Sequence, residues 1–299
     1  MVLTLIVALL SIFFALASPA GAVNVNCPAD SLQAAVNNAN PGDTLFVSGT
    51  CNENVLVRND KVRVFIQPSG APLSATIDGG GSGITLDIRG KAISVTNMII
   101  TGGNQGIVVQ RGSNAVIDGN IVQNAANQGI TVTSLAFAVI TNNEVRNNGD
   151  DGIGITESSD ARIGWNNNAN GPAGPNDIHN NGNRGIVVSR SSTARITSNN
   201  IHNNTSDGIR VARGSQIDAS TNTINGNGGD GIFVTENSAL TSGGDTNTLF
   251  VAGNSTTINN TGNGIRCSAG GAVNGIIATI NGTAGQTNIA GNCPNGLVP

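Results

Sequence analysis

The strongest constraint on this chain is a Gly-Ile dipeptide that recurs at a fixed spacing. Successive copies are one constant step apart, except for two longer steps, from Gly152 to Gly185 and from Gly231 to Gly264. Self-similarity at a fixed period of about 23 residues indicates a repeat architecture in which each unit stacks on its neighbours. The eight copies begin at Gly83, Gly106, Gly129, Gly152, Gly185, Gly208, Gly231 and Gly264.

Each repeat predicts three short strands. In Gly-Ile-x-Val, the Ile and the residue two positions later share one face of a strand, as in Ile84/Leu86 and Ile107/Val109. Two more apolar patches follow within the repeat, for example at 115–117 and at Val122. Three strands separated by Gly and Asn describe one coil of a three-sided parallel β-helix. The sequence therefore predicts an all-β solenoid with ~23 residues per coil.

Asparagines recur at one position of the repeat, at a constant distance after each Gly. Stacked coils would place their amides above one another, where each can donate to one neighbour and accept from the other. Asn also tolerates the left-handed conformation that a sharp corner needs. The predicted ladder contains Asn97, Asn120, Asn143, Asn166, Asn199 and Asn222.

The two ends of the chain differ from the repeats. Residues 1–22 predict a signal peptide, with an apolar run and the small residues Ala20-Gly21-Ala22 at the cleavage site. Residues 23–75 predict a cap and the first coils, with one amphipathic helix over residues 31–39 that covers the open end. Regular coils are expected over 76–266 and a final coil and cap over 267–299. The protein is expected to be secreted, periplasmic or on the cell surface.

The four cysteines lie near the two ends of the predicted solenoid. Cys27 and Cys51 form one pair in the sequence, and Cys267 and Cys293 form the other. The spacing within each pair is close to one repeat, so each pair can meet one layer apart and close an end by a disulfide. Free buried thiols are the alternative.

Composition excludes several classes of function. The net charge is −4, and the chain has no basic stripe or aromatic platform, which argues against a nucleic-acid partner. After the signal peptide no stretch is long and apolar enough to span a bilayer. High Gly and low charge would favour disorder, but the regular Ile/Val pairs supply an apolar stripe to bury. A monomer is expected.

The Gly-Ile repeats, the Asn ladder and the capping helix resemble the right-handed parallel β-helix family, whose superfold is pectate-lyase-like. The resemblance covers nearly all of the chain after residue 22. It implies a right-handed, single-stranded β-helix that binds polysaccharide along the outer groove of its first sheet. Lyases, hydrolases, epimerases and non-catalytic proteins share this coil, so the resemblance leaves the activity open.

Charged residues concentrate on the outward positions of the middle and later Gly-Ile strands. Adjacent coils are ~4.8 Å apart, so carboxylates and guanidinium groups in one column can form a catalytic pair, a Ca²⁺ site or an acidic-sugar site. Charge-balanced turns are the structural alternative. Two repeats are ten residues longer than the others, and the extra residues fall within 165–176, which begins at Trp165, and roughly within 241–255. The catalytic candidates are Asp151, Asp207, Asp230, Arg184 and Arg210, and the substrate-binding candidates are Arg190, Arg213, Glu157, Glu236 and Trp165.

One segment, residues 149–155, resembles the paired-Asp segment of polygalacturonase-type hydrolases. The resemblance is incomplete, because Arg184 stands where a His is expected and Gln128 where an Asp is expected. His179 and His202 are expected to extend a polar ladder on the third strand. A lyase that uses Ca²⁺ with Arg184 or Arg210 as base stays open.

The sequence is therefore compatible with two functions. The first is an exported protein that binds or processes a polysaccharide or cell-surface glycan, as a lyase or hydrolase of an acidic glycan. The second is a non-catalytic extracellular scaffold or adhesin, which the scarcity of aromatic residues favours. An ice-binding surface would need a Thr-x-Thr ladder, and only Thr131-Val132-Thr133 fits.

Overall fold

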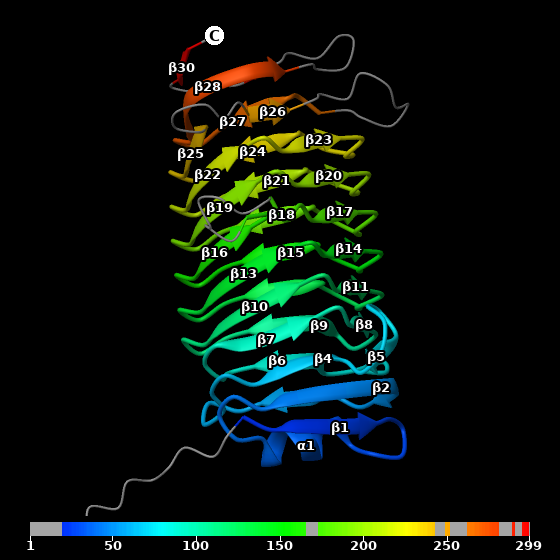
Figure 1. Ribbon diagram of the computed structural model, residues 1–299. Helices are drawn as coiled ribbons and strands as arrows, with labels where there is room; N and C mark the ends of the chain where they lie inside the picture. The colour runs from blue at the N-terminus through cyan, green and yellow to red at the C-terminus, as the bar shows by residue number, and fades with distance from the viewer. Residues whose placement is uncertain are drawn as a thin grey trace, which may run out of the picture.

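The computed structural model describes residues 20–165, 173–242, 249–251, 262–280, 289–290 and 295–298, with side chains described over 20–165, 173–241 and 262–274. The chain forms a right-handed parallel β-solenoid, as predicted, with one short helix near its N-terminus (Figure 1). Each coil contributes one strand to each of three parallel sheets, and successive coils stack along the long axis. The two insertions fall largely on residues outside the described ranges.

The Gly-Ile phrases build one ten-stranded sheet, here called the Gly-Ile sheet. Its strands are β3 (Val55–Val57), β6 (Ile84–Ile88), β9 (Gln105–Val109), β12 (Ile130–Val132), β15 (Ile153–Ile155), β18 (Ile186–Val188), β21 (Ile209–Val211), β24 (Ile232–Val234), β27 (Ile265–Cys267) and β29 (Ile289–Ala290).

The second sheet follows the Gly-Ile sheet within each coil. Its strands are β1 (Ala22–Asn26), β2 (Thr44–Asn52), β4 (Phe65–Pro68), β7 (Ile93–Thr96), β10 (Asn114–Asp118), β13 (Phe137–Thr141), β16 (Asp160–Ile163), β19 (Thr193–Thr197), β22 (Gln216–Ser220), β25 (Ala239–Ser242), β28 (Ala272–Ile280) and β30 (Asn295–Val298).

The third sheet completes the coil, and the end of β2 joins it. Its other strands are β5 (Ala75–Asp78), β8 (Ile99–Thr101), β11 (Ile121–Gln123), β14 (Glu144–Arg146), β17 (Asp177–His179), β20 (Asn200–His202) and β23 (Thr223–Asn225). The short strand β26 (Leu249–Val251) pairs with β28.

Inward Ile, Val and Leu from all three sheets fill the solenoid. Ile130 pairs with Ile153 and Val132 with Ile155, so β-branched apolar side chains stack from coil to coil. Of the predicted inward pair Ile84/Leu86, Leu86 is confirmed, but the prediction for Ile84 is wrong, because it is only half-buried. Leu86 and Ile88 align with Ile107 and Val109, and both are buried, whereas Ile84 aligns with Gln105. A shift of two positions keeps the same face inward, because side chains alternate with a period of two.

The predicted Asn ladder exists at the corner between the second and third sheets, with two corrections. Asn143 is typical: its Oδ1 accepts the backbone N–H of Asn120 at 2.9 Å, and its own Nδ2 donates to Asn176 Oδ1 at 2.9 Å. Asn176 takes the place predicted for Asn166, which lies outside the described residues. The ladder resumes at Asn176 because this repeat is ten residues longer than the others. Met98 takes the place predicted for Asn97, since the Met98 N–H bonds Asn120 Oδ1.

Two further polar columns hold the other corners. A second Asn ladder precedes the Gly-Ile strands and contains Asn148, Asn181, Asn204 and Asn227. A serine ladder follows them and contains Ser159, Ser192, Ser215 and Ser238, each accepting the N–H of the residue one coil earlier. These side chains are buried and hydrogen-bonded, which compensates for removing their polar groups from water.

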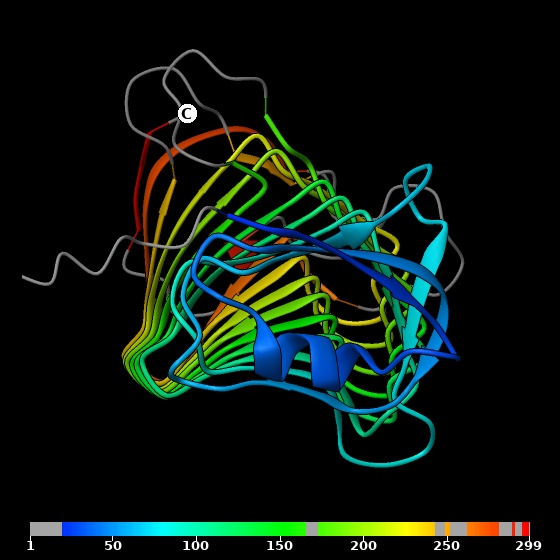
Figure 2. The same cartoon turned by 60° about the horizontal axis from the view of Figure 1, so that its bottom comes forward.

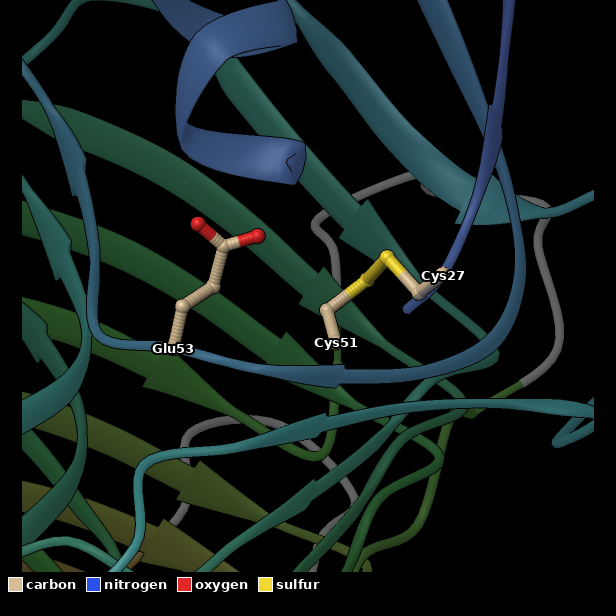
Figure 3. A group of neighbouring side chains, drawn as sticks. All are labelled: Cys27, Cys51 and Glu53. Carbon is tan, nitrogen blue, oxygen red and sulfur yellow. A yellow bond between two sulfur atoms is a disulfide. The ribbon is translucent and has the colours of Figure 1, made fainter. Parts of the chain in front are cut away.

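The N-terminal end is closed by α1 (Leu32–Asn38), which lies across the solenoid (Figure 2). Leu32 and Val36 face the core. Ser31 caps the helix, and Glu53 accepts the N–H of Leu32 at 2.6 Å. Cys27 and Cys51 form the first predicted disulfide, with Glu53 pointing toward the helix beside them (Figure 3). The second predicted disulfide involves Cys293, which lies outside the described residues.

Residues 1–19, which hold most of the predicted signal peptide, are also outside the described residues. In the part of the chain that the structure describes, no helix has the length and apolarity needed to cross a membrane.

Candidate functional site

The outward face of the Gly-Ile sheet carries a groove of about 470 Å³. The strands β9 to β21 form its floor, because their inward residues pack in the core and the alternate residues point outward into the groove lining. Its lining is polar at the β9 end, with glutamines and threonines, and cationic toward β24. The lining includes Gln128, Thr131, Asp151, Gly154, Arg184 and Arg210.

The side chains immediately before each Gly form a column that ties neighbouring coils together. Asp151 Oδ1 accepts the backbone N–H of Arg184 at 3.1 Å. Asp207 Oδ1 accepts that of Asp230 at 2.9 Å, and Asp230 Oδ1 accepts that of Asn263 at 2.8 Å. One oxygen of each carboxylate therefore bonds the backbone of the next coil. This contact belongs to the structural role that is the alternative to a functional site.

Asp151 has an unusual protonation equilibrium. Burial, followed by the negative charge of Asp150, raises its pKa to about 6, and the nearby Arg184 only partly offsets this rise. Arg184 Nη1 lies 3.4 Å from Asp151 Oδ1. A carboxyl with a pKa near neutrality can hold or accept a proton under physiological conditions.

Asp207 and Asp230 line a separate hollow of about 360 Å³, together with Arg266. Burial is the main cause that raises the pKa of Asp207. The Arg266 Nε donates to Asp230 Oδ2 at 2.5 Å, so this second carboxylate is already ion-paired. The three predicted carboxylates therefore divide between two hollows: Asp151 lines the groove, and the other two line the neighbouring one.

Four arginines and two carboxylates line the groove. Arg213 Nε lies 3.4 Å from Glu236 Oε2 and Arg210 Nη2 lies 4.0 Å from Glu236 Oε1. Arg190 pairs with Glu157 at the corner after β18. On the floor, the Arg210 guanidinium lies 4.9 Å from the ring centroid of Phe233. The predicted residues Arg184, Arg190, Arg210, Arg213 and Glu236 are thus brought to one face.

Trp165 lies elsewhere. It follows β16, and the Arg195 guanidinium of the second sheet stacks over its ring at 4.1 Å. The structure places it with the second sheet, away from the groove lining, and its predicted substrate-binding role stays a prediction.

Several groove residues were outside the predicted site. Gln105 and Gln128 hydrogen-bond each other at 3.0 Å, and Thr131 and Gly154 lie on the floor. The Thr131 Oγ1 and the Arg184 Nε are buried without a hydrogen-bond partner among the described residues. All of these positions belong to the outward columns of the repeat, but they are uncharged, so the concentration of charge does not identify them.

The two histidines face outward from the third sheet. His179 and His202 are one coil apart, as predicted, and their rings stack with centroids 4.9 Å apart. His202 Nε2 lies 2.9 Å from Asp177 Oδ1, and His179 Nε2 lies 3.3 Å from Glu144 Oε1. This is a polar ladder on a different face from the groove.

Metal-ligating atoms converge at the N-terminal end in Cys27, Cys51 and Glu53. The two sulfur atoms are bonded to each other and Glu53 caps α1, so this group serves the cap (Figure 3). The predicted Ca²⁺ near Asp207 and Asp230 stays a prediction.

A family model described as "right handed beta helix region" matches residues 43–175 and 175–285. No curated protein matches the chain. Among solved structures, the chain is similar to pectate lyase Pel9A, with 13% identity and a TM-score of 0.59 over 92% of this chain and 82% of that one. It is similar to the periplasmic alginate epimerase AlgG, with 15% identity and a TM-score of 0.55 over 92% and 65%.

It is also similar to the enzymatically active domain of tailspike protein 2 from bacteriophage CBA120, with 13% identity and a TM-score of 0.63 over 91% of this chain and 47% of that one. At this level of identity the three likenesses show the shared solenoid.

Proposed function

We propose that this chain, which belongs to the right-handed β-helix family, binds an acidic polysaccharide in the groove of its Gly-Ile sheet and cleaves it there. The charge of the groove carries the proposal. Four arginines face two carboxylates in its lining, whereas the whole chain has a net charge of −4. A concave cationic surface on an acidic protein favours an anionic ligand, and guanidinium groups bind carboxylates in a bidentate manner.

The arrangement of carboxyls favours elimination over hydrolysis. Glycosidases use two carboxyls about 5–9.5 Å apart. In the groove the carboxyl partner of Asp151 is Glu236, which follows a strand three coils away, and three coils span roughly 14 Å at ~4.8 Å each. Asp151 therefore has no second carboxyl of the groove lining within the distance that a glycosidase uses.

In the proposed elimination, Arg184 and Arg210 bind the carboxylate of a uronate unit and stabilise negative charge as it develops there. Asp151 takes the proton from the carbon beside that carboxylate. The released electron pair forms the new C=C bond, the bond to the glycosidic oxygen breaks, and that oxygen takes a proton from water. Asp151 is suited to this because, with a pKa of about 6, it is ionised above neutrality and still basic.

An exported location supports the same function. The Cys27–Cys51 disulfide fits an oxidising compartment, and the apolar N-terminal run fits a signal peptide. One of the solved neighbours is itself described as periplasmic.

The second candidate is a non-catalytic glycan-binding scaffold. The observation that favours it is that Asp151, Asp207 and Asp230 each bond a backbone N–H of the next coil. Under this candidate the carboxylates hold the stack and the arginines alone contact the glycan.

The test is a panel of pectate, alginate and glycosaminoglycans, with and without Ca²⁺. Binding is followed by calorimetry, and cleavage by the absorbance of unsaturated products and by reducing ends. We expect Asp151→Asn to lose turnover and Arg184→Gln to lose binding as well. The matched controls are Asp160→Asn and Arg162→Gln on the second sheet.

Binding without turnover would support the scaffold and reject the lyase. The absence of both binding and turnover with every acidic polymer would reject the proposed function.

A further inference from the structure

Gly154 interrupts the outward column on the floor of the groove. Its strand partners in the adjacent coils are Thr131 and Val187, and the column continues to Arg210 and Phe233. Gly154 is the only member of this run without a side chain. The floor is therefore lowered at one point, next to Asp151, and that point lines the 470 Å³ groove.

The backbone does not require glycine at this position. Its φ lies outside the left-handed region, and a Cβ added there would have Val187 Cγ1 at 3.6 Å as its closest neighbour, an ordinary van der Waals contact. Other glycines of the repeat differ: a Cβ on Gly152 or Gly185 would lie within 2.8 Å of neighbouring atoms. Glycine within a strand lowers stability, and where neither sterics nor φ demands it, it often marks a close approach by a ligand.

Two polar atoms in the groove lining lack hydrogen-bond partners among the described residues. Thr131 is 8% exposed, and its Oγ1 has no hydrogen-bond partner among the described residues; the same holds for the Nε of Arg184. A buried polar group left unsatisfied is unfavourable, so these two atoms in the lining of one groove call for a group that satisfies them. Together with the single open floor position, they point to a ligand.

We propose that Gly154 forms a subsite that admits one uronate ring, with Thr131 bonding a ring hydroxyl and Arg184 bonding the carboxylate. The inference rests on the proposed function and adds where the ring sits and which residue makes room for it. The backbone of Gly154 and the side chain of Val187 would contact the apolar face of the ring. Asp151 lies beside it, positioned to accept a proton.

This assignment makes Gly154 a specificity-determining residue. Val108, one coil beyond Thr131, has a side chain that fills the equivalent place, and so does Val187 on the other side. A ring that contacts the floor closely is therefore accommodated at one coil only, which fixes the sugar unit next to Asp151.

The test compares Gly154→Ala, Gly154→Val and Thr131→Val with wild type. The probes are oligogalacturonate and alginate oligosaccharides, with a neutral oligosaccharide of equal length, titrated by calorimetry. Affinity for the uronates should fall more than about tenfold for Gly154→Val and about fivefold for Thr131→Val, with Gly154→Ala in between wild type and Gly154→Val. Ser94→Val, at an outward position of the second sheet, is the matched control and should bind like wild type.

The thermal midpoint supplies the second readout. Both Val variants should keep or raise it, because a β-branched residue suits a strand and Thr131 Oγ1 makes no protein hydrogen bond among the described residues. Loss of affinity together with a lower midpoint would mean unfolding and would overturn the subsite.

Uronate binding equal to wild type in Gly154→Val and Thr131→Val, with loss only in Arg184→Gln, would overturn the subsite and leave the proposed function standing. Wild-type protein that binds none of the uronates would overturn both.

Discussion

Two of the polar columns of this solenoid differ in their surroundings. One lies inside a corner and the other lies on the outer face. The inner column, from Asn120 to Asn222, repeats one residue type, and each member bonds its neighbours and the backbone. The outer column, immediately before each Gly, changes from Gln to Asp to Arg and back to Asp. Both columns have the same spacing, so the difference lies in what surrounds them.

The inner column is sealed from water, where an unpaired amide would be costly, and only a side chain that both donates and accepts can stack on itself. The outer column borders a groove, where water or a ligand can complete unsatisfied groups. The groove therefore tolerates variation. Its lining contains Asp151, whose pKa is raised, and the atoms of Thr131 and Arg184 that lack hydrogen-bond partners among the described residues. In a repeat solenoid, function is therefore expected where the repeat stops repeating.

The largest effect is expected from breaking the inner column. Asn143→Ala removes the side-chain hydrogen bonds to the backbone N–H of Asn120 and to the carbonyl of Ile117, in a fully buried corner. We expect a loss of about 3–5 kcal/mol in the free energy of unfolding, measured by urea denaturation. The exposed Asn104→Ala should lose less than about 0.5 kcal/mol. Equal losses in the two variants would contradict the distinction between the columns.

The next effect tests Asp151 of the outer column and depends on pH. Because burial raises its pKa to about 6 from 3.8, the folded state binds the proton more tightly than the unfolded state. The stability it contributes is present below about pH 4 and is lost as the pH rises through 6. Asp151→Asn keeps an acceptor for the Arg184 N–H, so it should be more stable than wild type by about 1–3 kcal/mol at pH 8 and equal to it at pH 4.

Urea denaturation at pH 4, 6 and 8 measures this difference, with Asp160→Asn as an exposed control. A difference between wild type and Asp151→Asn that does not change with pH would mean that folding does not raise the pKa of Asp151, and would remove the basicity near neutrality on which its proposed role depends.

A smaller effect is expected in the serine ladder, which is buried like the Asn ladder but makes fewer bonds. Ser192 Oγ accepts the backbone N–H of Ser159 at 3.2 Å, and the Ser192 side chain is fully buried. Ser192→Ala should therefore cost about 1–2 kcal/mol in urea denaturation, less than Asn143→Ala. Ser82→Ala, at an exposed corner, should be neutral. A cost as large as that of Asn143→Ala would show that bond number does not set the strength of a column.

The repeat itself could be predicted from the sequence because alternation and corner chemistry are local. Identical local patterns give identical coils, so the sequence was sufficient to predict the three sheets, the capping helix and most of the Asn ladder. Predictions failed where the period changes. Leu86 aligns with Ile107, two positions short of a full repeat, which moved the register at Ile84, and the insertion replaced Asn166 by Asn176.

The candidate site could be predicted only in part, for a related reason. Charge in the outer columns identified Asp151, Glu236 and all four arginines of the groove lining. The openness at Gly154 and the unpaired hydroxyl of Thr131 depend on three adjacent coils at once, and no single repeat shows them. The separation of Asp207 and Asp230 into their own hollow also required the three-dimensional arrangement.

The smallest effect on stability is expected at the rim of the groove, where a charge can matter for binding alone. The side chain of Arg213 is 57% exposed and its partner Glu236 is 43% exposed, so their ion pair is well screened by solvent. Arg213→Gln should change the free energy of unfolding by less than about 0.5 kcal/mol.

The same substitution should weaken binding of an acidic polysaccharide, and more so at low salt than at high salt, because it removes one of four cationic groups from the lining. Titrations at two salt concentrations measure this, with Arg58→Gln near the N-terminal end as the control. If Arg213→Gln and Arg58→Gln weaken binding equally, the polymer responds to the charge of the whole protein. A selective effect of Arg213 means that the outer face, where the columns vary, is the surface that contacts it.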